Sequence, residues 1–284
     1  MRRMLAMTAT ALALTGCQHW QENTPVTLTG CDHETGWSDQ VRATAGETWL
    51  FAQMAANAYA GLAPFDLGPG VREIERRDND DAGFAYAIFE RAAAAGRPTA
   101  YVIAFRGTEN HDNPFVDWFY GNLLGRQNAR GLAVYDALRA RVGDAPIAVT
   151  GHSLGGGVAS HVSMCREGVD TYVFNSSPRF RRCDGEWIDN RRWSVVERGE
   201  ALKAGRVFLP EATQKYTSIN CTRTGGPVYQ HGMALLASCL TGLAAWAEPE
   251  ARTSLTRNAI PWPVDDGPRI VAARRAACPP LSGA

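Results

Sequence analysis

The sequence lacks several features that would assign it to common classes of protein. Its 284 residues contain no run of about 18 apolar residues, so we expect no membrane-spanning helix. Basic and acidic residues balance at 29 each, and the absence of a basic excess argues against nucleic acid as a partner. No internal repeat of about 20 to 50 residues is present, which argues against a solenoid. The composition, 45% hydrophobic and 20% charged, is typical of a globular protein with a sizeable core.

Closely spaced cysteine pairs are also missing. No two cysteines have C-x-x-C spacing, so we expect neither a zinc site nor a redox dithiol. The chemistry predicted below needs no metal or cofactor. Apart from Cys17, six cysteines remain, an even number that allows up to three disulfides. The sequence cannot choose among the 15 possible connectivities. These six are Cys31, Cys165, Cys183, Cys221, Cys239 and Cys278.

The N-terminus has the layout of an export signal. Arg2 and Arg3 precede a short, mostly apolar stretch that ends in the tetrapeptide LTGC at Cys17. This tetrapeptide resembles the lipobox of bacterial lipoproteins, in which cleavage precedes a cysteine that carries lipid. The resemblance implies a signal peptide over residues 1–16 and lipidation at Cys17. Because Gln18 and not aspartate follows, it also implies the outer membrane, facing the periplasm of a Gram-negative bacterium. An ordinary cleaved signal is the alternative.

Alternating strand and helix patterns predict an α/β fold with a mainly parallel sheet flanked by helices. Strands are expected at 84–90, 99–105, 147–150, 171–175 and 193–197, and helices at 47–60, 132–142 and 233–243. The first two strands are expected to pair as a hairpin. We expect a tether and connecting segment at 17–45, a catalytic domain at 46–247, and a C-terminal extension at 248–284 packed on or wrapping the domain.

The motif GHSLG at 151–155 carries the chemistry. It follows an apolar strand and opens a helix with one apolar face, which is the context of a nucleophile elbow. Gly151 and Gly155 leave room for a sharp turn that lifts the Oγ of Ser153 clear of the sheet. The same turn directs the N–H of Leu154 towards a developing oxyanion. The alternative, a phosphate-binding turn, would require Gly-Lys-Ser/Thr, which is absent.

A serine nucleophile requires a base. In the α/β-hydrolase order, the acid and then the histidine follow the serine. Only His161 and His231 follow Ser153 in the chain. His161 lies about two turns along the helix that leaves the elbow and is carried away from the serine. His231, which follows a Gly-Gly-Pro loop, is therefore the predicted base.

The acid of the triad must lie between Ser153 and His231. Triad acids follow the C-terminal end of a strand, and Glu200 follows the strand predicted at 193–197. We predict that Glu200 orients the imidazole through Nδ1. Asp189 and Glu197 are the alternative candidates for the acid. The full set of carboxylates considered is Glu167, Asp170, Asp184, Glu186, Asp189, Glu197, Glu200 and Glu211.

These motifs resemble those of the fungal-type (class three) lipase family of α/β-hydrolases. The matching segments are AFRGT at 104–108, VTGHSLGG at 149–156, SPR at 177–179 and SVVERGEAL at 194–202, and the similarity covers roughly 47–245. The resemblance implies that Thr108 completes the oxyanion hole with Leu154. The chain departs from the family in having Glu where Asp is usual, and in a shorter interval between the serine and the histidine.

In the family, the segment after the oxyanion residue forms or neighbours a lid. Here it contains large apolar residues that suit an acyl chain or a lipid surface: Phe115, Val116, Trp118, Phe119, Tyr120, Leu123 and Leu124. An amphipathic helix packed on the core fits the same pattern.

The sequence therefore predicts a serine hydrolase that cleaves lipid acyl esters, of the lipase or phospholipase type, through an acyl-enzyme. The expected partners are the lipid substrate and a membrane surface reached through the anchor at Cys17. A short-chain carboxylesterase or thioesterase is the alternative among enzymes. A non-catalytic lipoprotein that binds lipid or a protein partner is the alternative outside them.

Overall fold

The computed structural model describes residues 26–27, 39–59, 61, 63–78, 83–94, 96–107, 121–177, 183, 188–202, 215–221 and 226–261. The expected signal peptide, Cys17, Thr108 and the side chains of the expected lid segment lie outside these residues.

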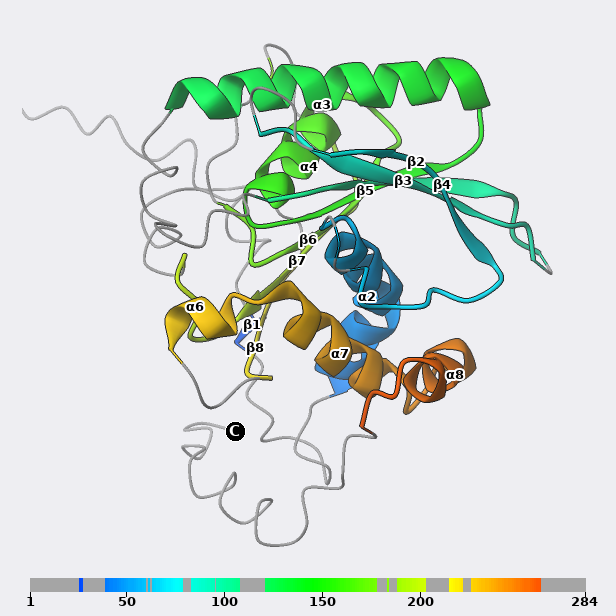
Figure 1. Ribbon diagram of the computed structural model, residues 1–284, viewed down its shortest axis with the longest axis vertical. Helices are drawn as coiled ribbons and strands as arrows, with labels where there is room; N and C mark the ends of the chain where they lie inside the picture. Colours follow the sequence, from blue (N-terminus) through cyan, green and yellow to red (C-terminus); the bar gives the residue numbers. More distant parts are fainter. Residues whose placement is uncertain are drawn as a thin grey trace, which may run out of the picture.

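One eight-stranded sheet forms the centre of the molecule (Figure 1). Its strand order is β1-β8-β7-β6-β5-β4-β3-β2. The strands are β1 (Val26–Thr27), β2 (Val71–Arg77), β3 (Tyr86–Arg91), β4 (Ala100–Phe105), β5 (Ile147–His152), β6 (Asp170–Phe174), β7 (Arg192–Glu197) and β8 (Lys215–Ile219). All pairs from β4 to β1 are parallel, whereas β2, β3 and β4 pair antiparallel. The predicted α/β fold is confirmed, and the expected hairpin is β3–β4.

Helices cover both faces of the sheet (Figure 1). One face is covered by α2 (Asp39–Asn57), α7 (Met233–Ala244) and α8 (Pro249–Arg257), and the other by α3 (Gly121–Val142) and α4 (Leu154–Cys165). The short helix α6 (Pro227–Gln230) precedes α7. Among the described residues, no helix combines the length and hydrophobicity needed to cross a bilayer.

The two apolar cores follow from the alternation of side chains along each strand. In β4, Val102 and Ala104 pack into the core beneath α2 and α7, whereas Ile103 and Phe105 pack into the core beneath α3 and α4. Because both faces are buried, the central strands are almost continuously apolar, which is why their sequence signal was strong.

The strands and helices that the sequence did not predict carry polar sequences. The edge strand β2, VREIERR, has only two apolar residues, as suits a strand that must not pair with another chain. Helix α8 buries only Ala251, Ser254 and Leu255. It lies within the expected C-terminal extension and packs on the domain, where Nε2 of Gln53 in α2 donates to Oγ of Ser254 at 3.0 Å. Helix α2 runs across the expected boundary at residue 46.

Two disulfides are present among the described residues. Cys165 at the end of α4 is bonded to Cys183, and Cys221 after β8 is bonded to Cys239 in α7. The expectation of disulfides is confirmed, and these pairs are two of those that the sequence left open. Cys31 and Cys278 lie outside the described residues.

Candidate active site

Ser153 lies at a sharp turn between β5 and α4. Its backbone has φ 55° and ψ −126°, a conformation that costs about 1–3 kcal/mol for a non-glycine residue. Close backbone packing makes the turn possible. A Cβ on Gly151 would overlap the backbone of Gly155, and a Cβ on Gly155 would overlap the end of β4. The two glycines are thus required by sterics, and the strained serine is the hallmark of a nucleophile elbow.

Hydrogen bonds tie this turn to the end of β6. The N–H of Ser153 donates to the carbonyl of Phe174 at 3.1 Å, and the N–H of Ser177 donates to the carbonyl of Ser153 at 2.8 Å. Leu154 opens α4, so its N–H belongs to the first turn of a helix, where donors have no partner within the helix. The positive end of the helix dipole adds to the attraction for an anion at this place.

The structure brings Glu200 and His231 together. Oε2 of Glu200 lies 2.7 Å from Nδ1 of His231. A carboxylate only accepts, so Nδ1 carries the proton and Nε2 keeps the lone pair that a general base needs. The same oxygen of Glu200 accepts from the N–H of Leu202 at 2.8 Å. The side chain of Glu200 is fully buried, whereas that of His231 is 19% exposed.

His152, the residue before the serine, links the elbow to the histidine. The ring centroids of His152 and His231 are 4.6 Å apart. Nε2 of His152 lies 2.7 Å from the carbonyl oxygen of His231 and must donate to it. In the neutral imidazole, Nδ1 is then an acceptor, and the hydroxyl of Tyr59 donates to it at 2.5 Å. The backbone of the candidate base His231 is therefore held by His152, the last residue of β5.

Asn175 binds the same carbonyl from the end of β6. Its Nδ2 donates to the carbonyl of His231 at 3.2 Å, and its Oδ1 accepts from the N–H of Glu197 at 2.7 Å. Asn175 is fully buried and has φ 41°, a region that asparagine tolerates better than most residues. This one side chain thus joins the strand that precedes Glu200 to the segment that carries His231.

The alternative candidates for the acid, Glu197 and Asp189, have other surroundings than Glu200. Oε2 of Glu197 accepts from the N–H of Cys221 at 3.2 Å, which ties β7 to the end of β8. Asp189 is exposed and precedes β7, so it lies at the opposite end of that strand from Glu200. Asp184, Glu186 and Glu211 are outside the described residues.

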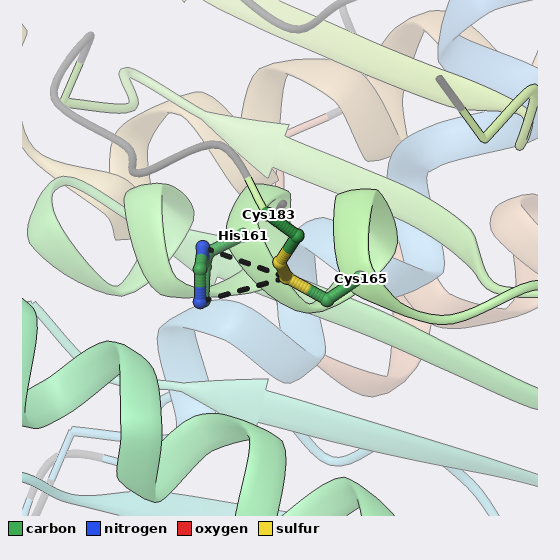
Figure 2. A group of neighbouring side chains, drawn as sticks. All are labelled: His161, Cys165 and Cys183. Atoms are coloured by element: carbon green, nitrogen blue, oxygen red, sulfur yellow. Dashed lines mark hydrogen bonds between the residues drawn. A yellow bond between two sulfur atoms is a disulfide. The ribbon is translucent and has the colours of Figure 1, made fainter. Parts of the chain in front are cut away.

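His161, the other histidine after the serine, faces a disulfide (Figure 2). Its ring nitrogens lie 3.6 and 3.8 Å from Sγ of Cys165. The ligand atoms of His161, Cys165 and Cys183 all lie within 4.8 Å of one another, as in a metal site. The two sulfurs are bonded to each other, however, and a zinc site of this type needs thiolates. The residues therefore do not fit a metal in this state.

Gly107 packs directly against the elbow. A Cβ at this position would lie 2.9 Å from Cβ of Ser153 and 2.8 Å from both the carbonyl oxygen of His152 and the hydroxyl of Tyr59. The backbone at Gly107, just before Thr108, therefore lies close to Ser153. Thr108 itself is outside the described residues, so its assignment to the oxyanion hole stays a prediction.

Sequence reasoning missed Tyr59, His152 and Asn175. Tyr59 and Asn175 carry no local motif, and their positions depend on packing between elements far apart in the chain. His152 stands at the variable position of G-x-S-x-G, so the motif gave no reason to select it.

Replacing His152 with phenylalanine is expected to lower kcat on a soluble ester by about ten- to a hundredfold, because the ring remains but the bond to His231 is lost. Tyr59→Phe is the matched control. It removes only the second hydrogen bond and should have the smaller effect. Steady-state kinetics and the unfolding temperature of both variants test this. Equal losses in both would contradict a direct role for the bond between the two histidines.

Comparison with known proteins supports the resemblance seen in the sequence. Residues 48–180 match the model of a family described as a Tle-like phospholipase domain. This stretch contains Ser153 and its elbow and ends before Glu200 and His231. The comparison with curated proteins finds no match.

Similar solved structures are lipases of low sequence identity. The lipase from Rhizopus microsporus var. chinensis has 16% identity and a TM-score of 0.42, over 56% of this chain and 67% of that chain. The triacylglycerol lipase from Penicillium expansum has 14% identity and a TM-score of 0.44, over 64% and 81%. Lip2 lipase from Yarrowia lipolytica has 14% identity and a TM-score of 0.41, over 57% and 73%. TM-scores at this level do not identify a substrate. The family-model match supports the lipase-like resemblance of the motifs, and with it a lipid ester hydrolase.

Proposed function

We propose that this protein hydrolyses acyl esters of phospholipids by a serine mechanism. The observation that carries the proposal is the strained turn at Ser153 with the Glu200–His231 pair held beside it through His152. The phospholipase-like family model over residues 48–180 supports a phospholipid over a triglyceride as the substrate.

In the proposed reaction, Oγ of Ser153 attacks the ester carbonyl while Nε2 of His231 takes the hydroxyl proton. The carbonyl oxygen becomes an oxyanion that accepts from the N–H of Leu154 and from Thr108. His231 returns the proton to the departing alkoxide, and the acyl-enzyme remains. Water then attacks the acyl-enzyme while His231 takes its proton, and His231 returns that proton to Oγ of Ser153 as the bond to the serine breaks and the fatty acid leaves. Glu200 holds the imidazole in the correct tautomer and stabilises the imidazolium.

The location proposed for this activity is a membrane surface. The lipobox-like sequence before Cys17 supports a lipid anchor in the outer membrane, facing the periplasm. Several acyl chains on one cysteine would hold the enzyme where phospholipid is abundant. Labelling with radioactive palmitate that disappears in a Cys17→Ser variant tests this proposal, and a label that persists would refute it.

The test of function compares the protein with its Ser153→Ala variant on a phospholipid, a triglyceride and a soluble short-chain ester. We expect hydrolysis of the phospholipid to exceed that of the triglyceride, and to fall by about a millionfold, to background, in the variant. A sharp preference for acetate or butyrate esters would favour the short-chain esterase. No reaction of Ser153 with a fluorophosphonate probe would favour the non-catalytic alternative.

A further inference from the structure

The disulfide between Cys165 and Cys183 has a histidine beside one of its sulfurs (Figure 2). The ring nitrogens of His161 lie 3.6 and 3.8 Å from Sγ of Cys165. His161 precedes Cys165 by one turn of α4 and is buried, so the helix that carries both residues holds the ring against the sulfur. Both cysteines are only partly buried, which leaves the bond within reach of a soluble thiol.

Two arginines bind carbonyl groups at the same end of α4. Nη2 of Arg192 donates to the carbonyl of Ser163 at 3.0 Å, and Nη1 of Arg166 donates to the carbonyl of Cys165 at 2.8 Å. The guanidinium of Arg166 is also paired with Asp136. Free carbonyls in the last turn of a helix would disfavour a negative charge on Cys165, but here they are bonded to cations. The usual obstacle to a thiolate at a helix C-terminus is therefore reduced.

The bond between Cys221 and Cys239 has different surroundings. Both cysteines pack against the apolar core beneath α2 and α7. The N–H of Cys221 donates to Oε2 of the buried Glu197 at 3.2 Å, so a carboxylate lies next to this cysteine. Apolar surroundings and a nearby negative charge both disfavour a thiolate. Each disulfide joins cysteines 18 residues apart, so the length of the closed loop does not distinguish them.

We infer that the bond between Cys165 and Cys183 is a site of thiol–disulfide exchange, which a dithiol reductant opens in the folded protein while the bond between Cys221 and Cys239 stays closed. The pair lacks C-x-x-C spacing, so no motif pointed to it. The inference is independent of the proposed hydrolytic function.

In the first step, a thiolate of the reductant attacks Sγ of Cys183 and forms a mixed disulfide. The electron pair of the broken bond goes to Sγ of Cys165, and the imidazolium form of His161 gives its proton to this sulfur. The second thiol of the reductant then attacks its own sulfur in the mixed disulfide, so that Cys183 leaves as a thiol and the reductant becomes a cyclic disulfide. His161 regains its proton from solvent, and overall the reductant supplies two electrons and two protons.

Opening this bond leaves the end of α4 attached to the strand beside it. Nδ2 of Asn190 donates to the carbonyls of Ser163 and Arg166 at 2.6 Å each, and Nε of Arg192 donates to Oγ of Ser163 at 2.9 Å. These bonds involve neither cysteine. We therefore expect the fold to survive the reduction, which releases Cys183 from the helix.

The test keeps the full chain under native conditions in mixtures of reduced and oxidised dithiothreitol, and then labels free thiols with an alkylating reagent. Mass spectrometry of the peptides shows which bond has opened. We expect Cys165 and Cys183 to be labelled at a ratio of reduced to oxidised dithiothreitol about tenfold lower than Cys221 and Cys239 require, which corresponds to about 30 mV. Labelling of both pairs at the same ratio, or of Cys221 and Cys239 first, would overturn the inference.

His161→Gln tests the part that the histidine plays. The amide occupies much of the same space but cannot be protonated, so the rate at which dithiothreitol opens the bond between Cys165 and Cys183 should fall about tenfold. The bond between Cys221 and Cys239 is the internal control, and its rate should not change. An unchanged rate at Cys165 and Cys183 would refute the role of His161.

Near-ultraviolet circular dichroism establishes that the variant and the reduced protein are folded. Loss of this signal together with labelling of both pairs would overturn the inference, because the bonds would then open by unfolding. Should the His161→Gln variant not fold, the comparison of the two bonds in the unaltered protein decides alone.

Discussion

Replacing Glu200 with glutamine is expected to lower kcat for ester hydrolysis by about three to four orders of magnitude. The amide keeps the size of the side chain, but it can offer its N–H to Nδ1 of His231. This favours the tautomer in which Nε2 carries the proton and cannot act as a base. The charge that would stabilise the imidazolium is lost as well. Steady-state kinetics on a soluble ester measure the effect, with substrate binding expected to change little.

Glu197→Gln is the control for this prediction. Glu197 is three residues away and also buried, but its carboxylate accepts from the N–H of Cys221. Its replacement is expected to cost stability, about 1–2 kcal/mol, and to leave kcat within about tenfold. A larger loss of kcat in Glu197→Gln than in Glu200→Gln would show that Glu197, and not Glu200, is the acid of the triad.

Replacing Gly107 with alanine is expected to lower kcat by about a hundredfold or more. The added Cβ would lie 2.9 Å from Cβ of Ser153 and 2.8 Å from the carbonyl oxygen of His152, closer than such atoms approach. Since β4 fixes the backbone that leads to Gly107, we expect Ser153 to shift, and a displacement of about 1 Å is enough for such a loss. The value of kcat and the rate of reaction with a fluorophosphonate probe measure how much reactivity Ser153 loses.

Gly125→Ala in α3 is the matched substitution. Nothing lies within 4 Å of the Cβ that it would add, and in a helix alanine is favoured over glycine by about 1 kcal/mol. This variant should keep full activity and gain a little stability. Normal activity in Gly107→Ala would show that the segment before Thr108 can move away from the elbow without harm.

The central part of the fold was predictable because its signals are local. Strands β3 to β7 are apolar runs between turns, and both faces of the sheet are covered, so the pattern is unambiguous. The elbow was predictable for a different reason. Its glycines are required by overlaps between β5, α4 and β4 that only glycine avoids.

Other parts could not be predicted because they depend on distant contacts. Strand β2 is mostly charged, and β8 is a short strand whose place is set by pairing with β7. The order of serine, acid and histidine along the chain predicted Glu200 and His231, but it could not predict the hydrogen bonds that position their segments. Those bonds come from Asn175 and His152, whose partners lie more than 50 residues away in the chain.

The disulfide between Cys221 and Cys239 encloses the segment that carries His231. One end of that segment leaves β8 and the other enters α7, and the Cα atoms of the two cysteines are 6.0 Å apart. A base on a closed segment samples far fewer positions than one on an open segment, because the crosslink removes chain entropy. While both thiols are reduced, as in the cytoplasm, this restraint is missing. For the exported enzyme that we propose, oxidation of the two thiols would add this restraint on His231 only after the chain has left the cytoplasm.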